Sequence, residues 1–420
     1  MCPVTSRAVT VGLGAAYVAA SALGPLVLKT TPSDLDVFFW PAAETAVSGH
    51  PLLIYSTVLH GNFFMDNGPL GLVPLVPVVA LANALGWAGS LTGRAALAGA
   101  VVSLFALLLA YQAVRFTTSA RGHLRWSLAV ACTVLLAPAL WIGVLDYGHI
   151  EQPLELCLVL LAVTWFRSSG NALTGVALGL AALTRTIAGL CAIPIVLAQI
   201  AARRGRPAAV TTVTAAITVL VILVPFLLAD GPAVTHSLFT NRSSLPIEGG
   251  SFWVVARQAS WSGLVEHVDA YLGAAVAIVL VAVTLRRRPG VATTQAGLMG
   301  LVTVASCCVP LFAKTDFPYY LLEPYVFAVL WWLARPGDVR NWRGVVPLLL
   351  TIDVFVVKAA LLSPFSIGGV VAGVSSSVIV ATATALVMVD LLHAPANAVA
   401  PRMSRQGSYQ QGVAAGREAK

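Results

Sequence analysis

The sequence predicts an all-α polytopic membrane protein, and three observations lead to this fold class. Hydrophobic residues make up 58% of the 420 positions and charged residues only 10%, whereas soluble domains carry roughly 25% charged residues. The mean hydropathy of +0.87 indicates that lipid solvates most of the chain. Apolar runs of about 20 residues, the length that crosses a bilayer core, recur along the sequence.

Twelve apolar segments are predicted to span the membrane within a single domain over residues 1–393. Their approximate boundaries are 8–28, 95–114, 126–144, 153–166, 171–187, 188–202, 208–229, 269–285, 293–313, 319–334, 344–363 and 370–393. A further apolar stretch, 68–87, is dense in proline and glycine, which break or kink helices. It is interpreted either as another span or as a helix lying in the membrane interface.

The basic residues decide between these two interpretations. If 68–87 does not cross and the N-terminus is cytoplasmic, seven of the 25 Lys and Arg residues fall outside: Lys29, Arg94, Arg185, Arg242, Arg257, Lys314 and Lys358. Cytoplasmic loops are enriched in basic residues, so this bias favours about twelve spans and an interfacial helix in the first external loop, 29–94. The polar tail 394–420 is expected to be cytoplasmic and disordered.

This topology places most of the polar and ionisable side chains that could serve catalysis or binding on the external segments 29–94, 145–152, 230–268 and 314–318. Asp66 is one of them. The external face is therefore predicted to be the working face. The basic residues lie in short loops and form no stripe with interleaved aromatic residues, so nucleic acid is not an expected partner. No Cys or His spacing predicts a metal site.

Two carboxylates, Asp34 and Asp36, stand just outside the first span and precede a run of aromatic residues. A partly desolvated carboxylate is more basic and suits general base catalysis. The alternative is that these acids simply decorate an external loop.

The loop from Asp146 to Pro153 is rich in donors and acceptors and includes His149 and Glu151. It could hold the hydroxyl groups of a sugar or orient the first-loop carboxylate. The alternative is a solvated turn, and two residues at this spacing make a poor metal site.

Two basic residues on the external side, Arg185 and Lys314, are candidates for binding an anion. Arg185 lies on the external side, where the positive-inside rule predicts few basic residues. A guanidinium matches the geometry of a phosphate. The alternative is that the side chain snorkels to the lipid headgroups. Lys314 invites the same interpretation more weakly, because it can pair with Asp316. Arg242 lies in the loop 230–268, whose aromatic residues suit either carbohydrate stacking or the interfacial belt.

Several short motifs resemble the GT-C superfamily of membrane glycosyltransferases, which use polyprenyl-phosphate sugars. These are Asp34 with Leu35, Val37 and Phe38, the stretch from Asn67 to Leu70, the loop from Gly148 to Pro153, and the helix from Gly175 to Arg185. Within the superfamily the chain is most similar to actinobacterial glycosyltransferase family 87, which includes α-1,2-mannosyltransferases of phosphatidylinositol mannosides and lipoarabinomannan. The similarity is best over residues 10–230.

The resemblance implies a GT-C-like bundle and roles for individual residues. Asp34 would take the proton from the acceptor hydroxyl, with Asp36 as the competing choice. Arg185 and Lys314 would face the donor phosphate, while His149, Glu151, Asp66 and Arg242 would contact substrate. Several relatives carry a His in a late external loop, whereas here the stretch from Lys314 to Tyr320 has none.

The expected function is therefore an inverting glycosyltransferase of a bacterial inner membrane with an external active site. It would move a sugar, expected to be mannose, from polyprenyl phosphate to a glycolipid or lipid-linked glycan, without a cofactor. The rival expectation is a transporter or flippase of a lipid-linked glycan, which would depend on Asp353 or Glu323, since intramembrane carboxylates often serve transport.

Overall fold

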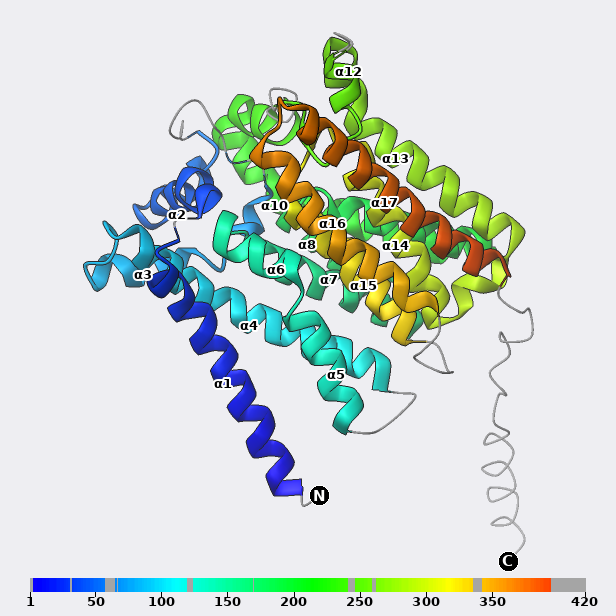
Figure 1. Ribbon diagram of the computed structural model, residues 1–420, viewed down its shortest axis with the longest axis horizontal. Helices are drawn as coiled ribbons and strands as arrows, with labels where there is room; N and C mark the ends of the chain where they lie inside the picture. Colours follow the sequence, from blue (N-terminus) through cyan, green and yellow to red (C-terminus); the bar gives the residue numbers. More distant parts are fainter. Residues whose placement is uncertain are drawn as a thin grey trace, which may run out of the picture.

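The chain folds into a bundle of α-helices with one pair of very short strands (Figure 1). The computed structural model describes residues 3–30, 32–56, 65, 67–118, 124–168, 170–240, 246–258, 262–334 and 342–393. The predicted spans correspond to α1 (Pro3–Leu28), α4 (Leu91–Thr118), α5 and α6 (Leu124–Leu135 and Pro138–Ile142), α7 (Glu151–Arg167), α8 (Asn171–Thr184), α9 (Ala188–Ala201), α10 (Gly205–Thr235), α13 (Ser262–Arg287), α14 (Gln295–Phe312), α15 (Leu322–Leu333), α16 (Val345–Leu362) and α17 (Ile367–His393). The all-α prediction is confirmed.

Shorter elements connect these helices. They are η1 (Leu35–Phe39), α2 (Trp40–Val47), η2 (Pro51–Leu53), η4 (Pro69–Gly71), α3 (Val76–Ala84), η5 (Gly143–Tyr147), η6 (His236–Thr240), β1 (Glu248–Gly249), α12 (Val254–Gln258), η7 (Pro289–Thr293), β2 (Thr315–Asp316), η8 (Pro318–Leu321) and η9 (Trp342–Gly344). The strands β1 and β2 pair in parallel, with Glu248 opposite Thr315. The predicted tail 394–420 lies outside the described residues.

Six of the described helices are long and apolar enough to cross a membrane, and the bent pair α5–α6 raises the number to seven. The six are α1, α4, α10, α14, α16 and α17. Such helices are those of a membrane protein. Helices α7, α8, α9 and α15 contain only 12 to 17 residues, so the count of twelve spans stays a prediction.

The stretch 68–87 forms a short 3-10 turn followed by the nine-residue helix α3. Nine residues rise about 14 Å at 1.5 Å per residue, which is less than half of the roughly 30 Å hydrocarbon core. This length agrees with the interpretation that the segment does not cross. In Figure 1, α2 and α3 lie together at one end of the bundle, beside the start of α4.

One predicted span is bent at a proline, and another begins as a 3-10 turn. The segment 126–144 bends by 41° where α5 gives way to α6. Pro138 begins α6, and a proline disfavours the helical conformation of the residue before it; Ala137 is extended, with ψ 121°. The segment 319–334 begins as the 3-10 turn η8 after Pro318, and α15 starts only at Leu322.

Side-chain contacts tie the connecting segments together at the two ends of the helices. At one end, Ser56 donates a hydrogen bond to Asp230 (2.6 Å), and Lys358 pairs with Asp146 (2.6 Å). At the other end, Arg343 pairs with Asp390 at 2.8 Å. The Arg167 guanidinium donates a hydrogen bond to the Gln295 side chain, and the Arg288 guanidinium donates one to the backbone oxygen of Leu392. Each of these contacts joins segments that the sequence assigns to the same side of the membrane.

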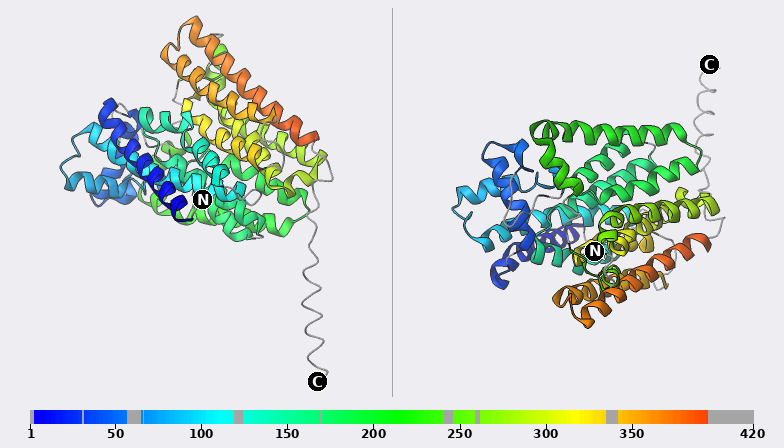
Figure 2. Two further views of the ribbon diagram at one scale, coloured as in Figure 1. Left: turned by 60° about the horizontal axis from the view of Figure 1, so that its bottom comes forward. Right: turned by 90° about the horizontal axis from the view of Figure 1, so that it is seen from above.

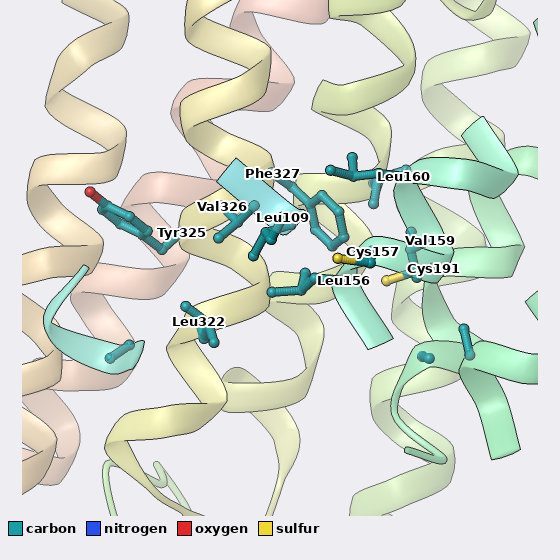
Figure 3. Close-up of a cluster of buried hydrophobic side chains, with 14 of the residues drawn as sticks. Leu109, Leu156, Cys157, Val159, Leu160, Cys191, Leu322, Tyr325, Val326 and Phe327 are labelled. Carbon is teal, nitrogen blue, oxygen red and sulfur yellow. The ribbon is translucent and has the colours of Figure 1, made fainter. Parts of the chain in front are cut away.

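Helices α4, α7, α9 and α15 all contribute buried side chains to the hydrophobic core. Figure 3 shows Leu109 of α4 and Leu156 of α7 packed beside Phe327 of α15, with Cys191 of α9 close by. The two views of Figure 2 place α10 and the α16–α17 pair on opposite flanks of the bundle, with the yellow helices α14 and α15 between them. Helices α7 and α15 both carry polar residues in their first turns, and Gln152 of α7 contacts Glu323 of α15 there.

Candidate functional site

Asp34 stands at the start of η1, the π-helical turn that follows the first predicted span. Three buried apolar side chains fix this turn in the core, since Leu35, Phe39 and Trp40 are each at most 1% exposed. The Asp34 side chain itself retains 19% exposure and accepts a hydrogen bond from the Ser33 hydroxyl at 2.8 Å. The sequence thus buries the apolar faces of the turn and leaves a carboxylate reachable at its edge.

His149 lies between two carboxylates and joins the first loop to the start of α7. Its Nε2 atom is 3.0 Å from Oδ2 of Asp34, and its Nδ1 atom is 2.5 Å from Oε1 of Glu151. The left-handed conformation of Gly148, with φ +80°, directs the chain into this position. A Cβ atom at Gly148 would meet the Cβ atom of Leu35 at 2.5 Å, so the glycine permits the close approach.

The charge state of His149 follows from its neighbours. Burial alone would lower the pKa of this imidazole, but the charge of Glu151 and hydrogen bonds to Asp34 and Glu151 outweigh burial and raise the pKa to about 9. The imidazolium present at neutral pH can therefore donate from both nitrogen atoms. Burial likewise opposes ionisation of Glu151, yet His149 and then Arg185 hold its pKa below the usual range.

Asp36 has different partners from Asp34. Its carboxylate lies 3.6 Å from the Arg94 guanidinium, which also approaches Glu44 at 3.9 Å and stacks over the ring of Trp40. Burial raises the pKa of Asp36 above its usual value, and Arg94 only partly offsets this effect. Asp36 is as exposed as Asp34, at 18%, but it belongs to a separate ionic cluster within the first loop.

A buried ionic network continues inward from Glu151. Arg185 directly follows the last residue of α8 and is 2% exposed. Its guanidinium forms a short contact with Glu323 and lies 3.5 Å from Glu151 and 3.6 Å from Glu155. Glu151 and Glu155 share one face of α7 because they are four residues apart. One guanidinium thus faces three glutamates.

Gln152 and a layer of aromatic side chains close the site from the side of η8. The Gln152 amide donates to the backbone oxygen of Tyr319 at 2.9 Å and to Glu323 at 3.3 Å. The Tyr319 ring lies 3.9 Å from the ring of His149, centroid to centroid. Phe317 stacks on Tyr319 at 5.3 Å, so the segment after β2 covers the imidazole.

The structure brings together only some of the predicted site residues. Asp34, His149, Glu151 and Arg185 form one continuous chain of contacts. Lys314 is 1% exposed, in the break between α14 and β2. The predicted substrate contacts Asp66 and Arg242 lie outside the described residues.

Sequence reasoning missed the structural partners of these residues. Arg94 was counted only for topology, although a basic residue on the external side signals a local acidic partner. Glu155 and Glu323 were considered for a transport pathway and in fact surround Arg185. No spacing links Glu323 to the site, because its contacts with Gln152 and Arg185 join elements that are far apart in the chain.

The described geometry belongs to a helical membrane protein with a carboxylate–imidazole–carboxylate chain at one end of its bundle. Among the residues that the structure describes, no group of three or more His, Cys, Asp or Glu side chains is arranged to hold a metal ion. No protein-family model matches the chain, and no characterised protein is significantly similar to it.

Proposed function

We propose that the protein is an inverting glycosyltransferase that moves a sugar from a polyprenyl-phosphate donor to a glycolipid or lipid-linked glycan. Mannose is the expected sugar, and the expected location is the outer face of a bacterial inner membrane. The observation that carries the proposal is the contact of Asp34 with His149, which in turn contacts Glu151. Asp34 is partly exposed, and the buried imidazolium of His149 fixes the orientation of its carboxylate. Such an arrangement suits a general base.

In the proposed reaction, Asp34 takes the proton of the acceptor hydroxyl as its oxygen attacks the anomeric carbon. The bond from that carbon to the phosphate oxygen breaks, and polyprenyl phosphate leaves with the bonding electrons. His149 donates to Oδ2 of Asp34 and so fixes the orientation of the carboxylate. Asp36 is the weaker candidate because Arg94 engages it.

The predicted role of Arg185 and Lys314 at the donor phosphate carries a structural condition. Both side chains are buried, and three glutamates already compensate the Arg185 charge. The rings of Tyr319 and Tyr320 lie against the Arg185 guanidinium, so contact of Arg185 with a phosphate requires these rings to move aside. In the described arrangement, Arg185 acts through Glu151, which it holds against His149.

The test is sugar transfer by purified protein in nanodiscs. Labelled polyprenyl-phosphate mannose and a glycolipid extract serve as substrates, and lipid products are separated and counted. The proposal predicts a new labelled lipid and release of unlabelled polyprenyl phosphate. If mannose, arabinose, glucose and galactosamine donors all yield no product with folded protein, the proposal is wrong.

A second candidate function is transport or flipping of a lipid-linked glycan. The specific observation in its favour is Asp353, a fully buried carboxylate in the middle of α16, since intramembrane carboxylates often mark transport pathways. Proteoliposomes with a fluorescent lipid-linked glycan distinguish the candidates. Transport predicts translocation that Asp353→Asn abolishes and Asp34→Asn leaves unchanged, with no new covalent product.

A further inference from the structure

A second polar cluster lies inside the bundle, among β2, α16 and α17. The strands β1 and β2 interrupt the helical architecture, with Gly249 opposite Asp316, and β1 packs against both α16 and α17. Asp316 of β2, Asp353 of α16 and Ser376 of α17 are each buried to within 1% of complete burial. Three separate elements therefore direct oxygen atoms into one enclosed region.

The atoms in this cluster are close together. The Ser376 hydroxyl donates to Oδ2 of Asp353 at 3.1 Å. A Cβ atom added to Gly250 would overlap Oδ2 of Asp316 and would lie 2.6 Å from the Ser376 hydroxyl oxygen. Gly250 thus leaves room for the Asp316 and Ser376 oxygen atoms to face one another.

The carboxylates in this cluster lack the partners that buried carboxylates require. Both oxygen atoms of Asp316 and Oδ1 of Asp353 have no hydrogen-bond partner among the described residues. Ion pairs in the described part of the chain include neither carboxylate. Buried polar groups are normally satisfied, and an uncompensated buried carboxylate carries a large desolvation cost. The orphaned oxygen atoms therefore point to a ligand.

We propose that Asp316, Asp353 and Ser376 bind a Ca²⁺ ion. Calcium takes six to eight oxygen ligands at about 2.3–2.6 Å, from carboxylates, hydroxyls and backbone carbonyls. Extended backbone of the kind found in β1 supplies such carbonyls, as the unwound segments of membrane transporters do for their ions. The two carboxylates carry two negative charges, which a divalent ion neutralises in a region of low dielectric.

Protons are the natural competitors for this site. A proton on Asp316 satisfies one oxygen atom and leaves the others without a donor, whereas one cation satisfies several at once. Binding of Ca²⁺ must displace protons, so its affinity increases with pH.

The bound ion has a consequence for the neighbouring segment. Asp316 directly precedes Phe317, and the segment continues to Tyr319, which covers His149. An ion shared by Asp316, α16 and α17 fixes the position of this segment relative to the C-terminal helices. The site is distinct from Asp34, and its existence does not depend on the proposed transferase activity.

The test measures ion binding by the purified full chain in a neutral detergent after treatment with EGTA. Saturable binding of one ⁴⁵Ca²⁺ per chain is expected at pH 8, with weaker binding at pH 6. Saturating Ca²⁺ should raise the apparent unfolding temperature by roughly 2–5 °C. Equal concentrations of Mg²⁺ or Na⁺ should not.

Two substitutions locate the ion. Asp316→Asn and Asp353→Asn should each weaken Ca²⁺ binding by more than about 100-fold, and Ser376→Ala should weaken it less. Asp146→Asn is the matched control, because Asp146 is an accessible carboxylate at the same end and already pairs with Lys358; this variant should bind Ca²⁺ as the wild type does. Without Ca²⁺, Asp316→Asn should be at least as stable as the wild type, because it removes an unsatisfied buried charge.

Absence of saturable Ca²⁺ binding by the folded wild type overturns the proposal, as does stabilisation by Na⁺ alone. Binding that persists unchanged in both asparagine variants also overturns it. If either asparagine variant does not fold, the assignment is tested with the wild type and Ser376→Ala instead. One Ca²⁺ bound per wild-type chain, together with unchanged Ca²⁺ affinity in Ser376→Ala, contradicts the assignment.

Discussion

His149 Nε2 lies 3.0 Å from Oδ2 of Asp34, although the two residues are 115 positions apart in the chain. This contact joins the first loop to the segment that begins α7, and Glu151 extends it on the other side of the imidazole. A cation between two carboxylates both orients and links them. The predicted working face thus contains one specific chain of contacts that can be altered residue by residue.

The stability of the protein should depend on the charge of His149. The pKa of His149 is about 9 in the fold, above the ordinary 6.5. The charged imidazole therefore contributes fully below pH 6.5, and its contribution disappears as the pH rises through about 9. Between these limits the difference corresponds to about 3 kcal/mol in the free energy of unfolding.

Unfolding in detergent, followed between pH 6 and pH 10, checks this prediction. The wild type should lose more stability over this interval than His149→Gln, which cannot become charged. Parallel curves for the two proteins would contradict the charged state of His149.

Replacement of Gly148 by alanine should separate the two carboxylates from the imidazole. The new Cβ atom would meet Leu35 at 2.5 Å in addition to the cost of a positive φ angle. Gly86 provides the control, because its φ is +71° but nothing lies within 4 Å of an added Cβ. We expect Gly86→Ala to cost about 1 kcal/mol and Gly148→Ala about 3 kcal/mol.

Thermal or chemical unfolding of both alanine variants, with sugar transfer measured in parallel, tests this difference. Gly148→Ala should also impair transfer, because Leu35 neighbours Asp34. Equal stability and equal transfer in the two variants would show that the approach of Gly148 to Leu35 is unimportant.

Removal of the Arg185 cation should lower the stability of the protein more than removal of one of the glutamates around it. Arg185→Gln leaves three buried glutamates facing one another and should cost about 3–5 kcal/mol. Glu155→Gln preserves the shape and removes a carboxylate whose oxygen atoms accept no hydrogen bond, so it should cost less than about 1 kcal/mol. Denaturant unfolding in mixed micelles measures both, and a larger cost for Glu155→Gln would contradict the account.

Hydropathy and the length of the apolar runs were sufficient to predict where most helices lie. The predicted segment 153–166 corresponds to Glu151–Arg167, and 293–313 corresponds to Gln295–Phe312. These patterns depend on local composition, so a single sequence contains them. The break before Pro138 was missed because a proline in an apolar run either kinks a helix or ends it, and tertiary packing determines the outcome.

The candidate site was predictable only in part. Asp34 and His149 stand out as polar residues beside apolar runs, and the loop at 146–153 was considered as a means to orient the first-loop carboxylate. The partners Arg94 for Asp36 and Glu323 for Arg185 depend on contacts between distant elements. No spacing rule in the sequence encodes such contacts, so the different partners of Asp34 and Asp36 became visible only in the structure.

Sugar transfer by Asp34→Asn and Asp36→Asn, measured side by side, tests the central claim most directly. Both variants keep the size of the side chain and remove the base. We predict that Asp34→Asn loses transfer by about 100- to 10,000-fold. Asp36→Asn should retain most of its activity, because its partly exposed pair with Arg94 contributes at most about 1 kcal/mol. Full activity of folded Asp34→Asn together with an inactive Asp36→Asn would contradict the account and assign the base to Asp36.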